Sequence, residues 1–324
     1  MKVLIAYDGS QCSDSALDDL THAGLPENGE ALIVSVADVW LPPPPPSTAE
    51  ILELAATTKG AVALERKYMA NARVVKDADA MAAKAAARFQ ANFPGWIVKY
   101  ESVWGSPNWI LFSKAEEWHA DLIIVGSHGR TALGRFFLGS ISQWLLNEAR
   151  CSVRVARGKL DEPDFPVRLL LAFDGSRGSE KALEEIASRN WPAKSEVRVV
   201  MVDQPLELTY IGGMAPPLVE SIGSFNEEEQ SRREKLVKTA VKKLENAGLR
   251  TMGNVLEGDP KHVLIKVAED WRADCVFVGA TGLTNRVERF LLGSTAAAVA
   301  ARAHCSVEVV RKRKRARRTN GNRN

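Results

Sequence analysis

The sequence predicts an α/β protein made of two tandem open sheets, each mostly parallel, five-stranded and covered by helices on both faces. Five sequence blocks occur twice in the same order, and short apolar runs alternate with helical patterns in both copies. Strands that alternate with helices are typical of parallel sheets covered on both faces. The length of 324 residues suits two domains.

The internal repeat can be read directly from the sequence. The segment Lys2–Ser10 (KVLIAYDGS) recurs as Arg168–Ser176 (RLLLAFDGS), and the pentapeptide CSVRV at Cys151 recurs as CSVEV at Cys305. The other three blocks begin at Gly105, Asp121 and Arg135 and recur at Gly258, Asp274 and Arg289. Five blocks in one order indicate a duplication. We therefore expect domains over residues 1–158 and 167–311, followed by a basic tail over residues 312–324 that we expect to be disordered.

The elements follow one order in both repeats. Residues 2–7 and 168–173 are apolar runs that end at Asp-Gly-Ser, as expected for a buried parallel strand that meets a turn. Ser13 and Ser179 stand where an N-cap would begin the next helix. Further strands are predicted at 31–36, 97–103, 121–125 and 152–156, and at 197–202, 250–256, 274–278 and 306–310. Long helices are predicted at about 60–92 and 226–247. The order of the strands in each sheet does not follow from the pattern.

A glycine-rich segment follows the fourth strand of the first repeat. It reads Gly126-Ser-His-Gly129, then nine residues, then Gly139-Ser140. Glycines let the backbone turn sharply and bring its N–H groups close to a ligand. Gly139 and Ser140 open a predicted helix, whose unpaired N–H groups and dipole favour an anion. The segment therefore indicates a phosphate site at the carboxyl ends of the strands, where ligands bind in open α/β sheets.

This spacing, G-x2-G-x9-G-[ST], resembles the nucleotide signature of the universal stress protein family. The resemblance covers both repeats almost end to end and implies a tandem two-domain member with a Rossmann-like, adenine nucleotide α-hydrolase-like fold. It also implies a regulatory protein of the stress response that binds ATP, ADP or AMP, and it leaves open whether Mg²⁺ accompanies the nucleotide. The binding residues that it implies in the first repeat are Ala6, Asp8, Val36, Val125, Gly126, His128, Gly129, Arg130, Gly139, Ser140 and Ile141. In the second repeat they are Ala172, Asp174, Val202, Gly279, Gly282, Gly293, Ser294 and Thr295.

The second repeat departs from the signature. Ten residues separate Gly282 from Gly293, one more than the pattern has, so we expect the first site to bind nucleotide in preference to the second. Asp8 and the glycines also have a structural interpretation: Asp8 as a residue that caps the turn, and the glycines as turns without a ligand. His128 is interpreted as loop filler rather than a catalytic base, because the second repeat has Thr281 in its place.

Composition limits the other classes of function. With 45% hydrophobic and 26% charged residues and without a long apolar stretch, the sequence predicts a cytoplasmic protein without a membrane span. The four cysteines lack metal-ligand spacing, so we expect reduced thiols and name no metal ligand. No phosphate-loop lysine motif and no nucleophile with a matched base are apparent, so we name no catalytic residue; a slow ATPase ranks last.

Partners are predicted from the ends of the repeats. Eight Lys/Arg and no acid lie from Arg311 onward, which makes nucleic-acid binding conceivable, although a solvated tail is favoured. The resemblance implies that the last strands of the two repeats pair as an antiparallel seam inside the chain, and it leaves a further homodimer open. The alternative function is a protein-interaction module without nucleotide, which would use the proline run Pro42–Pro46, the variable loop after the second strand and the tail.

Overall fold

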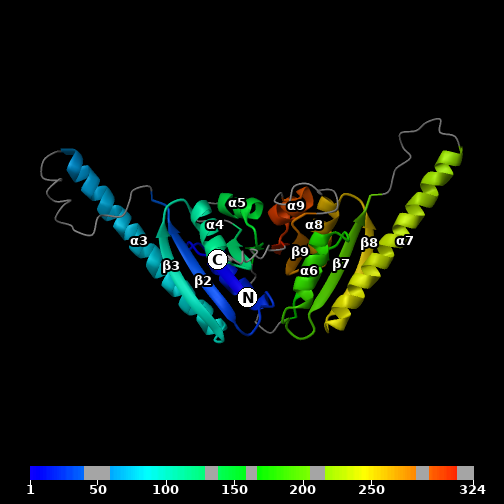
Figure 1. The fold of residues 1–324 in the computed structure, drawn as a ribbon, viewed down its shortest axis with the longest axis horizontal. Helices are drawn as coiled ribbons and strands as arrows, with labels where there is room; N and C mark the ends of the chain where they lie inside the picture. Colours follow the sequence, from blue (N-terminus) through cyan, green and yellow to red (C-terminus); the bar gives the residue numbers. More distant parts are fainter. Residues whose placement is uncertain (40–58, 128–137, 158–165, 205–215, 282–291, 312–324) are drawn as a thin grey trace, which may run out of the picture.

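The computed structural model describes residues 1–39, 59–127, 138–157, 166–204, 216–281 and 292–311. Their strands form one ten-stranded sheet in the order β3-β2-β1-β4-β5-β10-β9-β6-β7-β8. Each repeat supplies five neighbouring strands, and the two sets meet at β5 and β10. Figure 1 shows the resulting wide V, with the long helices α3 and α7 at its two outer ends.

The bounds of the elements agree closely with the predicted ranges. In the first repeat the strands are β1 (Lys2–Ala6), β2 (Gly29–Ala37), β3 (Trp96–Trp104), β4 (Leu122–Gly126) and β5 (Ser152–Ala156). Its helices are α1 (Gln11–Asp19), the 3₁₀ turn η1 (Leu20–His22), α3 (Lys59–Asn92), α4 (Pro107–Glu117) and α5 (Ser140–Glu148).

The second repeat has the same elements in the same order. Its strands are β6 (Arg168–Ala172), β7 (Glu196–Asp203), β8 (Arg250–Glu257), β9 (Cys275–Gly279) and β10 (Ser306–Val310). Its helices are α6 (Arg177–Ala187), α7 (Pro216–Asn246), α8 (Pro260–Asp270) and α9 (Ser294–Arg302).

Two expectations about helix starts are wrong. The N-caps of α1 and α6 are Ser10 and Ser176, whose side chains accept hydrogen bonds from the backbone N–H of Ser13 and Ser179. The helices therefore begin three residues earlier than predicted, directly after the Asp-Gly turn. Helix α7 begins at Pro216, about ten residues before the predicted start. Proline is tolerated in the first turn of a helix, where its missing N–H costs no hydrogen bond.

Each half of the sheet is parallel, and its strand order reverses direction beside the first strand. In the first repeat β1 pairs in parallel with β2 on one side and with β4 on the other. The chain runs outward to β3 and returns to the other side of β1, which creates a switch point between β1 and β4. The carboxyl ends of the strands at such a point leave room for a ligand.

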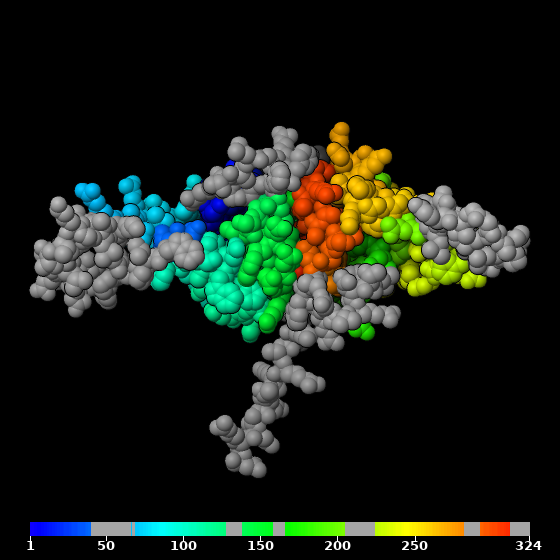
Figure 2. Space-filling view, turned by 90° about the horizontal axis from the view of Figure 1, so that it is seen from above, coloured from blue at the N-terminus to red at the C-terminus, as the bar shows by residue number. Residues whose placement is uncertain are grey.

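Hydrophobic clusters of the described residues bury the two faces of the sheet. Alternate residues of β1 face opposite ways: Val3 and Ile5 pack under α1 and α3, whereas Leu4 packs under α4 and α5. The cluster that contains Leu4 continues without a break through the second repeat, where α8 and α9 cover it. Figure 2 shows the segments around α5 (green) and α9 (orange-red) lying side by side at the centre of the molecule. No helix of the described residues is long and apolar enough to cross a membrane.

The two repeats join through the antiparallel pair β5–β10, the pairing that the resemblance led us to expect. Val153 lies opposite Val309, Arg154 opposite Glu308, and Val155 opposite Val307. These residues are almost completely buried. The seam is therefore a continuation of the protein interior and not a surface contact between two separate bodies.

Candidate functional site

The first candidate site lies at the switch point, where β1, β2 and β4 end side by side. Ala6 is the last residue of β1 and lies opposite Val34, two residues before Val36. Gly126 is the last residue of β4 and lies opposite Ala156. The three strands thus bring Ala6, Val36 and Val125, which the resemblance implies as site residues, to one edge of the sheet.

The apolar residues of this edge share one cluster. Ala6, Val36 and Ile141 are partly buried and pack against the same core as the buried Val125. The second repeat places Ala172 and Val202 against that core in the same way, whereas Thr295 stands in the position of Ile141. Each edge therefore offers a partly exposed apolar floor on the side of the sheet that α5 or α9 covers.

The turn after β1 shows a structural role for the predicted aspartate. Gly9 has φ +72°, a left-handed conformation that favours glycine. The Asp8 carboxylate accepts a hydrogen bond from the N–H of Ser10 at 3.0 Å, and Asp174 accepts one from Ser176 at 2.9 Å. Both carboxylates thus hold the turn that begins the next helix, and any contact with a ligand is additional to this role.

Close packing explains one glycine of the signature in each repeat. A Cβ atom on Gly126 would lie 2.9 Å from the carbonyl carbon and oxygen of Cys12 in α1. A Cβ atom on Gly279 would lie 2.5 Å from the carbonyl carbon of Gly178 in α6. Because the obstructing atoms belong to the backbone, a larger residue at either position must displace a helix.

The far end of the glycine-rich segment is tied back to the sheet. The N–H of Gly139 donates to the carbonyl of Ser127 at 2.8 Å, and the N–H of Gly293 donates to Ala280 at 2.7 Å. The Ser142 hydroxyl donates to the carbonyl of Gly126 at 2.8 Å. The amide of Gly139 is therefore engaged within the protein, and an anion would have to meet the amides that follow it.

Helix α5 begins at the switch point without a side-chain cap. Its N-cap residue is Gly139, which has no side chain, and among the described residues no side-chain hydrogen bond caps the helix; the same holds for Gly293 and α9. By contrast, serine side chains cap α1 and α6. Ser140 is exposed at the first position of α5. A helix start of this kind attracts an anion through its N–H groups and dipole.

A polar group flanks the first site on the other face of the sheet. The Tyr7 hydroxyl donates to Asp14 at 2.7 Å, and Arg88 of α3 forms ion pairs with Asp14 and Asp18. Burial and this hydrogen bond raise the pKa of Tyr7 to about 12. The phenol therefore remains neutral at physiological pH and serves to join β1, α1 and α3.

Sequence reasoning did not single out Cys12, Ser127 or Ser142, although all three touch the loop ends. Cys12 lies against Gly126, and its sulfur is 4.0 Å from the Ser127 hydroxyl oxygen. The internal repeat could have identified Cys12. Gly178 occupies the equivalent position in the second repeat, which indicates that only a small side chain fits there. The predicted residues His128, Gly129, Arg130 and Gly282 lie outside the described residues, as do Pro42–Pro46 and the tail.

We expect Cys12 to react first with a thiol reagent. Cys151, Cys275 and Cys305 are buried, and burial raises the pKa of Cys305 to about 12 and that of Cys275 further. Cys12 is partly exposed. With Ellman's reagent at pH 8, one of the four thiols of the native protein should react rapidly, because reactivity needs access and a thiolate. Cys12→Ser should abolish that phase, and rapid reaction of a second thiol would contradict the expectation.

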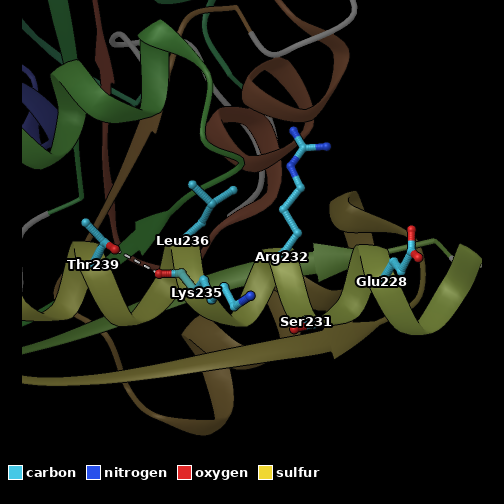
Figure 3. A pocket seen from close by; sticks show the side chains of 6 residues that line it. All are labelled: Glu228, Ser231, Arg232, Lys235, Leu236 and Thr239. Carbon is cyan, nitrogen blue, oxygen red and sulfur yellow. Dashed lines mark hydrogen bonds between the residues drawn. The ribbon is translucent and has the colours of Figure 1, made fainter.

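A surface hollow lies along helix α7 of the second repeat. It has a volume of about 380 Å³ and is lined by Glu228, Ser231, Arg232, Lys235, Leu236 and Thr239 of α7. Figure 3 shows Arg232 and Leu236 leaving α7 on the same side. Leu236 packs under α7 with the core of the second repeat, whereas Val202 packs under α8 and α9. The hollow therefore lies on the α7 side of the sheet, opposite the face that carries the apolar floor of the second site. Within the described ranges, no group of three or more His, Cys, Asp or Glu side chains is placed to hold a metal ion.

Comparison with known proteins identifies the family. A model of the universal stress protein family matches residues 1–157 and 167–311. A universal stress protein of Methanocaldococcus jannaschii is 32% identical over 148 residues, which cover 46% of this chain and 84% of that protein. A crystal structure of a universal stress protein from Archaeoglobus fulgidus covers 97% of both chains with a TM-score of 0.60 at 16% identity, which shows a shared fold. An Arabidopsis thaliana family protein crystallised with AMP matches 45% of this chain and 92% of that one, at 17% identity and a TM-score of 0.33. Since the family model spans both repeats, the chain belongs to the universal stress protein family.

Proposed function

We propose that this universal stress protein binds an adenine nucleotide at the switch point of its first repeat and acts as a nucleotide-responsive regulator in the stress response. The observation that carries the proposal is the uncapped start of α5 beside the ends of β1, β2 and β4. An apolar floor and an anion-attracting helix start at one edge are complementary to a base and its phosphates. The signature in the sequence adds independent support.

The roles of the residues follow from their positions. Val36 and Ala6 would contact the adenine, and Asp8 would border the base and ribose. Ser140 and Ile141 would donate their backbone N–H groups to the phosphates, with the Ser140 hydroxyl as a further donor. Gly126 and Gly139 would act by keeping the backbone close, since the amide of Gly139 already donates to Ser127.

The second repeat is the weaker candidate. Ser294 and Gly293 repeat the uncapped helix start, and Asp174 repeats the turn. Its floor is less apolar, because Thr295 stands in the position of Ile141, and its loop is one residue longer. We therefore propose one nucleotide per chain at the first site as the main bound form.

Matched charge substitutions test the proposal at each site. Ser140→Asp and Ser294→Asp place a carboxylate at the first position of α5 or α9. Such a carboxylate suits the helix dipole and leaves the fold intact, but it repels a phosphate. We expect Ser140→Asp to weaken ATP, ADP or AMP binding by about tenfold or more, because like charges oppose one another at the site. Ser294→Asp should change binding little.

The measurement is isothermal titration of each nucleotide, with and without Mg²⁺, together with mass spectrometry of nucleotide released from freshly purified protein. Unchanged melting temperatures of both variants serve as the control for folding. Equal losses in both variants would place nucleotide in both repeats. No bound nucleotide and no binding at millimolar ATP would overturn the proposal.

The alternative is a protein-interaction module of the same fold without nucleotide. It is favoured by one observation: packing against α1 and α6 already accounts for Gly126 and Gly279. A third possibility, slow ATP hydrolysis, would show as steady phosphate release that disappears in Gly129→Asp.

A further inference from the structure

The central residue pair of the seam is the one place in the paired pentapeptides where the two repeats differ in charge. Arg154 and Glu308 hold the same position in the repeated pentapeptides CSVRV and CSVEV. They lie directly opposite one another in the β5–β10 pair, with Val153 and Val155 on either side of Arg154. The approximate two-fold axis that relates the repeats therefore passes through this pair.

Four buried charges form a row of alternating sign across the seam. Asp19 of α1 accepts from Nε of Arg154 at 2.6 Å, and a guanidinium nitrogen of Arg154 lies 3.4 Å from a carboxylate oxygen of Glu308. Arg189, two residues after α6, completes the row with two contacts to Glu308. Arg154 is 1% exposed and Glu308 is 0% exposed, so water does not screen these charges.

The contacts around this row repeat symmetrically. The N–H of Arg157 donates to the Ser306 hydroxyl, and the N–H of Arg311 donates to the Ser152 hydroxyl. The guanidinium of Arg157 bonds to the carbonyl of Ala300 near the end of α9, and that of Arg311 bonds to Leu146 near the end of α5. These contacts would form equally well between two first repeats or between two second repeats, so they do not select a partner.

The row of buried charges, by contrast, selects the unlike repeat as the partner. Pairing two first repeats would place Arg154 opposite a second Arg154, and pairing two second repeats would place Glu308 opposite a second Glu308. In each case two like charges would meet in a buried strand pair, which specific interfaces use to reject wrong partners. We propose that the Arg154–Glu308 pair makes the seam heterotypic, so that each repeat accepts the unlike repeat and rejects its own kind. The proposal does not depend on nucleotide binding.

Cutting the connection between the repeats in the folded chain tests this selection. A protease site placed between residues 158 and 165 allows cleavage after folding, so that covalent linkage no longer dictates the partner. Native mass spectrometry then counts unlike and like pairs after dilution and re-equilibration. We expect unlike pairs to exceed about nine in ten, against about one half for statistical pairing.

The matched control removes the two charges that face each other across the seam, keeps Asp19 and Arg189, and keeps the apolar residues of the seam. In the cleaved Arg154→Met/Glu308→Met variant, like pairs should rise toward the statistical share. Statistical pairing of the cleaved natural sequence, or unchanged selection in the double variant, would overturn the proposal.

A second experiment covers the case in which cleaved repeats do not re-equilibrate. Full-length Arg154→Glu and Glu308→Arg chains with different tags are co-expressed. The Glu308→Arg chain keeps Arg154 in its first repeat, and the Arg154→Glu chain keeps Glu308 in its second. Pairing between these two repeats of different chains therefore restores the natural Arg154–Glu308 pair. We expect the two tags to co-purify more than those of two Arg154→Glu chains or two unaltered chains. Equal co-purification in all three pairs would overturn the proposal.

Discussion

Replacing Arg154 with methionine is expected to lower the free energy of unfolding by about 3–5 kcal/mol. The change removes the guanidinium that forms the ion pair with Asp19 and leaves that carboxylate buried with the Ser306 hydroxyl, which donates to it at 2.6 Å. Glu308 loses one partner but keeps Arg189. Breaking a buried pair from one side leaves a charge without compensation, which costs more than the pair contributed.

Arg154 remains charged at neutral and moderately alkaline pH. Burial alone would lower the pKa of this guanidinium, but Asp19, Cys275 and Glu308 together raise it well above its ordinary value. A basic group whose pKa is higher in the folded than in the unfolded protein contributes its full stabilisation below the unfolded pKa. That stabilisation is lost as the pH rises through the folded pKa. The cost of Arg154→Met should therefore persist at neutral and moderately alkaline pH.

Guanidinium chloride unfolding, followed by fluorescence, measures this cost. Lys243→Met provides the matched control, since Lys243 pairs with Glu180 at 2.8 Å but half of its side chain is exposed. Exposed pairs contribute about 0–1 kcal/mol, so the control should be nearly neutral. An equally small effect of Arg154→Met would mean that water or rearrangement relieves the buried row of charges.

Gly279→Ala is expected to be the second largest perturbation, with a loss of about 1–3 kcal/mol or more from overpacking. The added Cβ would lie 2.5 Å from the carbonyl carbon of Gly178 and 2.8 Å from the N of Ser179. These are backbone atoms in the first turn of α6, so the helix has to move away from β9. Gly126→Ala should cost less, because the nearest atoms of Cys12 are 2.9 Å away.

Gly248→Ala separates the effect of crowding from that of backbone strain. Gly248 has φ +85°, and a Cβ atom added there would meet nothing within 4 Å, so its substitution costs only conformational strain, about 1–2 kcal/mol. Thermal unfolding of the three variants ranks them. If Gly279→Ala were no more damaging than Gly248→Ala, the close approach of α6 to β9 would not be a constraint on this position.

The sequence predicted the elements well because the repeat allowed each pattern to be read twice. The strands 152–156 and 306–310 appear with the predicted bounds, and the other strands differ by one or two residues at an end. Helix starts were less predictable. Ser10 and Ser13 are both residue types that cap helices well. Which of them caps α1 depends on where the Asp-Gly turn ends and the helical backbone conformation begins.

The candidate site was predicted in part. The resemblance implied Ala6, Val36 and Val125 as site residues, and the structure places these three at one edge of the sheet against one core. The hydrogen bond from Gly139 to Ser127, and the contact of Gly126 with Cys12, were not predictable. They join residues that are distant in the chain, and their distances depend on how a helix and a strand pack.

By itself, the sequence determined the α/β class, the duplication and the family, because periodicity and short motifs depend only on residues that are close together in the chain. Only the tertiary structure decided the strand order, with its switch point between β1 and β4, and the register that sets Arg154 against Glu308. In the sequence these two residues are one difference among many between the repeats. The fold turns this difference into a buried ion pair, because antiparallel pairing about a two-fold axis places equivalent positions opposite one another where water does not screen their charges.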